Sequence, residues 1–203
     1  IFPPTIGGPA TYVFSLANSL HVHGWNVKIL CYGKPDKMVL NKGIKINWVS
    51  NEWPLPIKYF FYFKKLFLFS WGYKIIYAMG PVASGLPAIL LKKITGKKVI
   101  IKVVGDYAWE QAINTGQTEL LIDEFQNKKF GGKINQLQKI EKWVCQKANV
   151  IITPSEYLKK IVSGWGADED KIKVIYNAFI KGENEKVKKE KGLIISAGRM
   201  VLW

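Results

Sequence analysis

Hydrophobic residues along the first part of the chain follow a helical pattern. After two consecutive glycines, apolar side chains recur at intervals of three and four residues, at Val13, Leu16, Ala17 and Leu20. Gly8 would be the N-cap, and Pro9 would be the first helical residue, where the missing N–H of proline has no cost. The pattern therefore predicts a helix that Gly24 ends.

Further along, short segments rich in valine, isoleucine and aromatic residues alternate with amphipathic segments. We predict strands at 25–32, 44–48, 74–78, 97–104, 149–153 and 171–176. Between and after them the spacing predicts helices at 56–71, 83–94, 116–130 and 134–144, and one more that Ser155 caps. Because such alternation is typical of βαβ units, the predicted fold class is α/β, a Rossmann-like open parallel sheet with helices on both faces.

The segment boundaries divide the chain into three parts. We expect residues 1–180 to form one domain whose first strand is largely missing, because a turn that opens a helix normally follows a strand. The charged residues 181–191 are typical of a linker. Residues 192–203 have the pattern of the first strand and turn of a second, truncated domain.

Composition narrows the class of protein. A chain of 203 residues with 48% hydrophobic and 22% charged residues fits a globular protein with a substantial core. None of its apolar runs is long enough for a membrane-spanning helix. Cys31 and Cys145 lie far apart without metal-ligand spacing, so we predict no metal site and interpret them as reduced thiols in a cytoplasmic protein.

The net charge of +15 implies an anionic partner, which could be nucleic acid, an acidic membrane surface or a phosphorylated substrate. The lysines at 186–191 are flanked by acids and fit a solvated linker better than a binding surface. Segment 58–71 combines aromatic residues with lysines, which suits the surface of an anionic bilayer. The same segment equally fits a helix that packs on the sheet with its lysines in water.

Three turns that contain glycine fall where predicted strands end, namely Gly7-Gly8, Gly80-Pro81 and Gly105-Asp106. In open α/β sheets, ligands bind outside the carboxyl ends of the strands. A glycine turn that leads into a helix also presents free backbone N–H groups, which suit a phosphate. Asp106 would either line a ligand site at these strand ends or simply cap the helix that begins at Tyr107.

Several segments together resemble the amino-terminal domain of retaining glycosyltransferases of family 4, which have the two-domain GT-B fold. They are the Gly7-Gly8 turn with its helix and segments 24–27, 148–155, 174–178 and 196–199. The resemblance implies transfer of a sugar from a nucleotide-sugar to an acceptor with retention of configuration, in most relatives without a metal. It implies no cofactor, because the nucleotide-sugar is a co-substrate.

The resemblance also implies which residues bind the donor. Gly7 and Gly8 would bring backbone N–H groups close to the donor phosphates. Arg199 matches an arginine in the first turn of the second domain, and its planar guanidinium suits phosphate oxygens.

The predicted catalytic and acceptor-binding residues follow the strand that ends at Val104. Relatives carry a histidine at this strand end, followed by an aspartate, whereas this chain has Gly105-Asp106. Asp106 is therefore the predicted catalytic residue. Tyr107, Trp109 and Glu110 would bind the acceptor sugar, although core packing is an equal alternative for Trp109.

The expected partners are a nucleotide-sugar donor, a saccharide or lipid-linked acceptor and the anionic inner face of the cell membrane, but not nucleic acid. We expect the chain alone to be inactive, because the donor-binding domain is not part of it. One alternative is a Rossmann-type oxidoreductase, although the chain has no Gly-x-Gly-x-x-Gly motif. The other is a non-enzymatic basic module that binds nucleic acid or membrane, with residues 58–75 as its local support.

Overall fold

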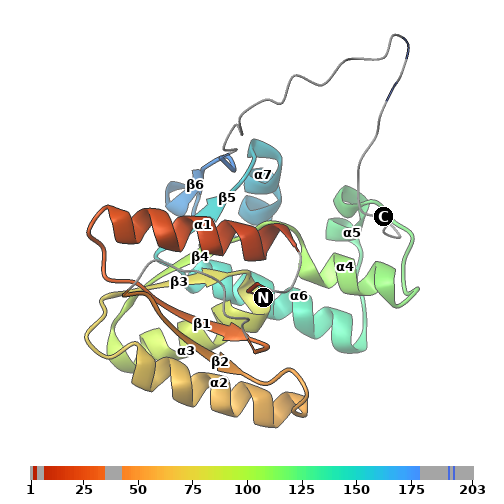
Figure 1. Cartoon of the computed structure of the whole chain (residues 1–203). Coiled ribbons are helices and arrows are strands. Elements are labelled where there is room, and N and C mark those ends of the chain that lie inside the picture. The colour runs from red at the N-terminus through yellow and green to blue at the C-terminus, as the bar shows by residue number, and fades with distance from the viewer. Residues whose placement is uncertain (1, 4–6, 35–42, 179–191, 193, 195–203) are drawn as a thin grey trace.

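The computed structural model describes residues 2–3, 7–34, 43–178, 192 and 194, which form parallel sheets flanked by helices (Figure 1). The strands are β1 (Lys28–Tyr32), β2 (Lys45–Val49), β3 (Ile75–Met79), β4 (Lys98–Lys102), β5 (Val150–Thr153) and β6 (Ile172–Val174). The α-helices are α1 (Gly8–Val22), α2 (Leu55–Phe69), α3 (Leu86–Thr95), α4 (Tyr107–Asn114), α5 (Ile122–Asn127), α6 (Gly132–Lys147) and α7 (Glu156–Gly164). Two short elements, η1 (Pro81–Gly85) and η2 (Glu169–Lys171), precede α3 and β6. The predicted α/β class is confirmed.

The described strands form two parallel sheets rather than the single sheet predicted. One has the order β1-β2 and the other the order β3-β4-β5-β6. An apolar cleft of about 180 Å³ lies where a continuous sheet would join them, lined by Ile29 and Cys31 of β1, by Tyr77 and Met79 of β3 and by α1. No hydrogen-bonded pairing joins β1 to β3 among the described strands.

Helices cover both faces of the sheets, as predicted. On β1, the alternate residues Ile29 and Cys31 pack in a cluster with Ala17 of α1. Leu30 and Tyr32 point the other way and pack against the larger cluster that contains the buried residues of α2. Successive side chains of a strand point to opposite faces, so α1 and α2 lie on opposite sides of this sheet.

The main core lies between the four-stranded sheet and the helices of one face. Val99 and Ile101 of β4 are fully buried, as are Val144 of α6 and Val162 of α7. Burial of aliphatic side chains from a central strand and two helices stabilises the sheet and fixes where its strands end.

Several predicted boundaries differ from the observed ones. The N-cap of α1 is Gly7 rather than Gly8, which moves Pro9 to the second helical position. The prediction of a helix at 116–130 is wrong at both ends, because the observed helix is the shorter α5. Gly116 adopts a positive φ of 66° in the turn that ends α4, and Lys128 is extended. A left-handed glycine cannot continue an α-helix, so the chain reverses before α5 begins.

The helix predicted at 83–94 begins instead as the π-helical turn η1, which continues into α3. A Cβ atom on Gly85 would lie 2.9 Å from both the Gly80 carbonyl oxygen and Val144 Cγ1. The wide turn therefore packs directly against α6, and only glycine fits there.

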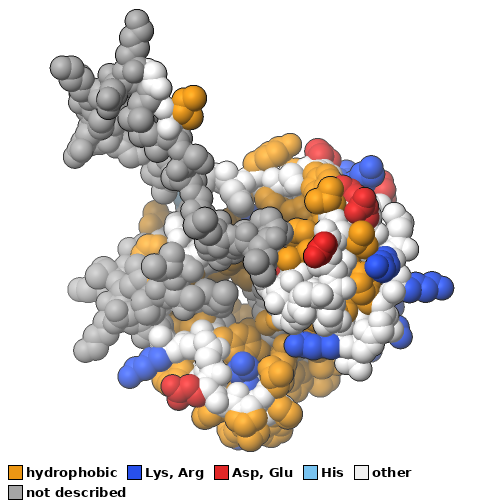
Figure 2. Space-filling model, turned by 90° about the vertical axis from the view of Figure 1, so that its right-hand side faces the viewer, with side chains coloured by type: hydrophobic (Ala, Val, Ile, Leu, Met, Phe, Trp, Pro, Cys, Tyr) orange, Lys and Arg blue, Asp and Glu red, His pale blue; other side chains and the backbone are white. Residues whose placement is uncertain are grey.

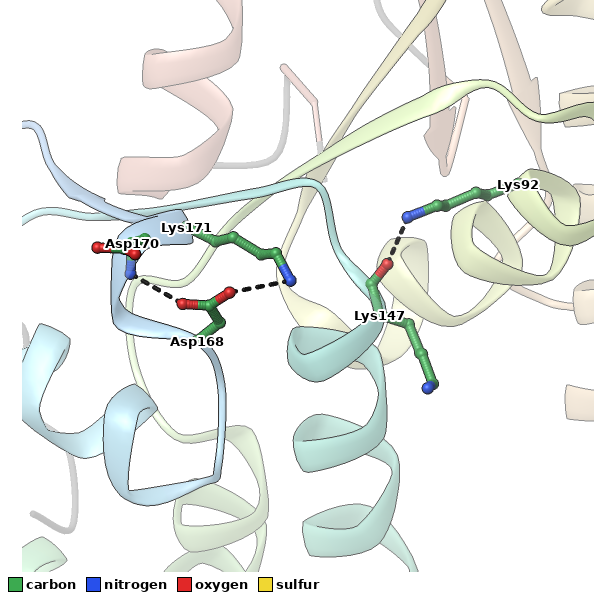
Figure 3. Close-up of polar contacts among 5 residues, drawn as sticks. All are labelled: Lys92, Lys147, Asp168, Asp170 and Lys171. Carbon is green, nitrogen blue, oxygen red and sulfur yellow. Dashed lines mark hydrogen bonds and ion pairs between the residues drawn. The ribbon is translucent and has the colours of Figure 1, made fainter.

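Polar contacts connect the elements at the edge of the sheet where the strands begin, which we call the amino edge (Figure 3). This edge lies opposite the carboxyl ends of the strands, where ligands were predicted. Lys92 Nζ donates to the Lys147 carbonyl oxygen at the end of α6, at 2.7 Å. Asp168 accepts from the Asp170 backbone N–H at 3.1 Å and pairs with Lys171 Nζ at 3.2 Å. Burial, and then repulsion by neighbouring lysines, lowers the pKa of Lys92. Several cations therefore gather at this edge.

The predicted linker at 181–191 lies outside the described residues, as does the predicted second domain at 192–203 apart from residues 192 and 194. The division into domains therefore stays a prediction. Cys31 and Cys145 are both free and buried. Among the described residues, no helix has the length and apolar character needed to cross a bilayer.

Candidate functional site

The three glycine turns lead into helices that start at the carboxyl edge of the sheets (Figure 1). The helix α1 begins at Gly8, η1 follows β3 at Pro81, and α4 follows β4 at Tyr107. Because parallel strands end at the same edge, their following turns converge there. The candidate site is this edge.

Asp106 is buried at the start of α4, with 2% of its surface exposed. Its Oδ1 accepts a hydrogen bond from the Trp109 backbone N–H at 2.8 Å, as an N-cap does. Its Oδ2 accepts from Gln126 Nε2 of α5, also at 2.8 Å. Both carboxylate oxygens thus have partners inside the protein. The capping role left open by the sequence is present, and the catalytic role stays a prediction.

Glu141 of α6 is a second buried carboxyl group at the same place, and sequence reasoning missed it. Its Oε1 accepts from the Tyr107 backbone N–H at 2.9 Å, and its Oε2 accepts from Ala108 N–H at 3.1 Å. It also shares a hydrogen bond with Asp106. The signal was available, because Glu141 lies four residues after Leu137, on the buried stripe of its helix.

Burial raises the pKa of both carboxyl groups. The negative charge of Asp106 is the next largest cause for Glu141, whose pKa rises well above its ordinary value. The hydrogen bond between the two groups raises the pKa of Glu141 and lowers that of Asp106. Glu141 is therefore the carboxyl group of the pair that is protonated more readily.

The hydrogen bonds of Asp106 and Glu141 also connect to helices α5 and α7. Gln126 of α5 donates to Asp106 and accepts from Trp165 Nε1, the residue that ends α7, at 2.8 Å. Together with Glu141 of α6, these contacts connect α4, α5, α6 and α7. The start of α4 is therefore held on every side by hydrogen bonds from neighbouring elements.

The predicted acceptor-binding residues lie in the first turn of α4, in different environments. Tyr107 is 40% exposed, and Glu110 is half-buried beside Gly105. Trp109 packs against the core cluster that contains Phe125, and its Nε1 donates to the Leu120 carbonyl oxygen at 2.8 Å. The structure thus leaves Tyr107 and Glu110 accessible, while Trp109 has the core-packing role that was its alternative.

The start of α1 contrasts with the start of α4. The Gly7 carbonyl oxygen accepts from the backbone N–H groups of Ala10 and Thr11, at 3.0 and 3.2 Å. Among the described residues, no side chain caps α1 and no acidic residue lies in its first turn. The positive end of the α1 dipole is therefore uncompensated there, whereas two carboxyl groups close the start of α4.

Lys102, the last residue of β4, is fully buried at this edge and was also missed by sequence reasoning. Its Nζ donates to Asn177 Oδ1 at 2.9 Å and lies 3.9 Å from the centre of the Tyr12 ring. Tyr12, on α1, also shares a hydrogen bond of 3.0 Å with the hydroxyl of Tyr77 on β3. These contacts bring α1, β3, β4 and the segment after β6 together around one cation.

Within the described part of the chain, no three His, Cys, Asp or Glu side chains gather as a metal site requires. The Thr153 hydroxyl, at the end of β5, is buried and has no hydrogen-bond partner among the described residues. Ile152 is paired in register with Lys102, so Thr153 lies on the opposite face of the sheet. The groups that suit an anion are therefore the Lys102 ammonium and the backbone N–H groups of Gly7 and Gly8, because Pro9 has no N–H and those of Ala10 and Thr11 bond to the Gly7 carbonyl oxygen.

Comparisons with known proteins agree with this architecture. A family model described as Glycosyltransferase Family 4 matches residues 6–179. Crystal structures of Anabaena Alr3699/HepE have a similar fold. The complex with UDP and glucose matches with a TM-score of 0.60 at 13% sequence identity. The complex with UDP-glucose matches with a TM-score of 0.58 at 14% sequence identity. Each match covers 88% of this chain but 43% of the Anabaena protein, so the chain spans less than half of that relative. No curated protein sequence matches the chain.

Replacing Glu141 by glutamine (E141Q) tests the raised pKa of Glu141. A carboxyl group whose pKa is raised on folding stabilises the fold below its ordinary pKa of 4.5, and this contribution is lost as the pH rises towards the folded pKa. The melting temperature of the wild type should therefore fall relative to that of E141Q as the pH rises above 4.5. Thermal unfolding across this range measures it.

The matched control for E141Q is Glu119→Gln, at an exposed position. Its melting temperature should follow that of the wild type at every pH. A constant difference between the wild type and E141Q over the whole range would contradict a proton on Glu141.

Proposed function

Because the chain belongs to glycosyltransferase family 4, we propose that it is the amino-terminal, acceptor-binding half of a retaining enzyme that transfers a sugar from a nucleotide-sugar. The observation that carries the proposal is the family match over residues 6–179, together with parallel sheets flanked by helices. Since the Anabaena relative was crystallised with UDP-glucose, a UDP-sugar is the proposed donor class. The proposed acceptor is a saccharide or a lipid-linked saccharide.

The proposed donor site uses the uncompensated start of α1. Departure of a nucleoside diphosphate places negative charge on its phosphates, and fixed backbone N–H groups stabilise such charge without reorganising. Gly7 and Gly8 have no side chains to keep a phosphate at a distance from the backbone. Arg199, which lies outside the described residues, is proposed to act on the same phosphates from the second domain.

The proposed acceptor site lies beside the first turn of α4. Tyr107 and Glu110 can offer a hydroxyl, a ring face and a carboxylate to a sugar. Asp106 and Glu141 hold the N-terminus of α4 and with it the position of these side chains. We propose that Asp106 acts in catalysis through its charge at this edge, in addition to its placement of α4.

We also propose that the outer face of α2 contacts an anionic membrane. On the inner face of the helix, Tyr62 and Leu66 are buried in the core. On the outer face, exposed hydrophobic side chains recur at helical spacing at Ile57, Phe60 and Leu68, and Trp71 follows just after the helix. The exposed Lys64 lies in the middle of this stripe. Hydrophobic side chains gather at the lower end of the molecule, the level at which Figure 1 places α2 (Figure 2). Exposed aromatic and aliphatic side chains with a lysine suit a bilayer surface.

Sugar transfer is tested by incubating the chain and the full-length protein with labelled UDP-sugars and saccharide or lipid-linked acceptors. We expect transfer by the full-length protein and none by the chain alone, because one domain cannot enclose the reaction centre. In the full-length protein, Asp106→Asn keeps the cap but removes the charge. It should lower the turnover about a hundredfold, the scale of losing one electrostatic group. It should also lower the melting temperature, because one amide oxygen cannot accept both hydrogen bonds of the buried carboxylate.

The control in that assay is again Glu119→Gln, which should keep the wild-type turnover. Turnover by the chain alone that equals the full-length rate would contradict the assignment to one half of a transferase. A near-normal rate for Asp106→Asn would rule out its catalytic importance.

Membrane contact is tested by flotation of the chain with vesicles of phosphatidylcholine and phosphatidylglycerol. The wild type should float with the vesicles, and the double variant Phe60→Ser, Leu68→Ser should not, because it loses apolar area that would enter the bilayer. Leu121→Ser is the control, since Leu121 is 70% exposed but lies away from α2, at the N-cap of α5. Equal flotation of the double variant and the wild type, or none by either, would contradict the proposal.

A further inference from the structure

The fully buried lysine at the end of β4 has few partners for its charge. Lysine is rarely fully buried, because an ammonium group loses its hydration unless other groups replace the water. Within the described residues, Lys102 Nζ has one hydrogen bond, to the amide oxygen of Asn177, and one ring contact, with Tyr12. Both partners are neutral. An ammonium group has three N–H donors, so these contacts do not use its full capacity.

Its charge also lacks a nearby acid. In the part of the chain that the structure describes, the single ion pair within 4.0 Å joins Lys171 and Asp168, at the opposite edge of the sheet. The buried carboxyl groups at the same edge, Asp106 and Glu141, are bound to the N–H groups of α4, to Gln126 and to each other. Lys102 is therefore a buried cation without a described counter-ion.

A second positive feature belongs to α1, the helix whose Tyr12 contacts the ammonium. Tyr12, which covers the ammonium, lies in the second turn of α1, just after the uncompensated N-terminus of that helix. The positive end of a helix dipole and an ammonium group repel each other in a low dielectric, and an anion between them would remove this cost. The two features come from different elements and favour the same kind of ligand.

One of the two described partners of the ammonium lies at the surface. Asn177 follows β6 and is exposed, so a change of its rotamer would free one N–H group of Lys102 Nζ for another acceptor. An incoming oxyanion would take the place of the amide oxygen and form a charge-assisted hydrogen bond, which is stronger than the neutral one that it replaces.

We propose that Lys102 binds a phosphate oxyanion of a substrate, next to the start of α1, with Tyr12 and Asn177 holding the ammonium in position until the substrate arrives. This rests on the proposed transferase function and adds a phosphate-binding residue to it. The phosphate belongs either to the nucleotide-sugar donor or to a lipid-phosphate acceptor. The chemistry at Lys102 is the same in both cases.

Calorimetric titration of the chain with pyrophosphate, UDP and a short-chain polyprenyl phosphate tests the proposal. Lys102→Met keeps the length of the side chain, removes the charge and suits a buried position, so the fold should persist. It should weaken binding of the preferred probe at least about tenfold, the scale of one charge-assisted hydrogen bond. Lys102→Arg, which keeps the charge, should bind better than Lys102→Met. Lys98→Met, at the exposed start of β4, should bind as the wild type does.

The pattern of probes identifies the source of the phosphate. Tighter binding of UDP than of polyprenyl phosphate assigns the donor, and the reverse assigns the acceptor. Absence of binding of all three probes to the wild type would overturn the proposal. Equal affinity of the wild type and Lys102→Met would also overturn it, and a lowered melting temperature would then assign Lys102 a structural role.

The outcome is separable from that of the proposed function. Loss of phosphate binding in Lys102→Met together with no sugar transfer by the full-length protein would keep the phosphate site and refute the transferase. Sugar transfer by the full-length protein with an unchanged KM in Lys102→Met would keep the transferase and refute the site.

Discussion

The N-terminus of α4 is closed by two carboxyl groups of the same chain, and the functional interpretation depends on this contact. Asp106 and Glu141 together accept the N–H groups of Tyr107, Ala108 and Trp109, which a free helix N-terminus would offer to a ligand. Both carboxyl groups are buried and bind these N–H groups, so the chain itself satisfies the positive end of the helix. A phosphate at this edge must therefore find its donors elsewhere.

The remaining donors lie at the start of α1 and at Lys102. No described side chain caps α1, and Lys102 lies under its second turn with two neutral partners. The carboxyl edge thus has two halves. In the first, at the start of α4, the polar groups are satisfied by the chain itself, and the second, at α1 and Lys102, is positively charged. Under the proposed function, the first half would receive an uncharged sugar acceptor beside Tyr107 and Glu110, and the second half would receive phosphates.

The order of helices and strands could be predicted from the sequence, because aliphatic runs such as 149–153 and amphipathic stripes such as 134–144 reflect burial directly. The π-helical start of α3 could not, because it depends on the contact of Gly85 with the distant Val144. The division into two sheets also depends on tertiary pairing, which strand composition does not encode. Element boundaries moved where glycine conformation decided them, as at Gly116.

Part of the candidate site could be named from the sequence, and the part that could not depends on tertiary contacts. The glycine turns and Asp106 were found, because turn residues and strand ends are visible in a sequence. Lys102 was missed, because lysine usually marks an exposed position and its burial depends on Tyr12 and Asn177, which are far away in the chain. Glu141 was missed although its spacing on α6 placed it on the buried face.

Amide hydrogen exchange of the chain with and without pyrophosphate tests the central claim most directly, namely that α1 and not α4 receives the anion. The account predicts that pyrophosphate slows exchange in residues 7–13 and 175–178, which surround Lys102, and leaves residues 107–112 unchanged. Slower exchange in residues 107–112 with no change in residues 7–13 would contradict it.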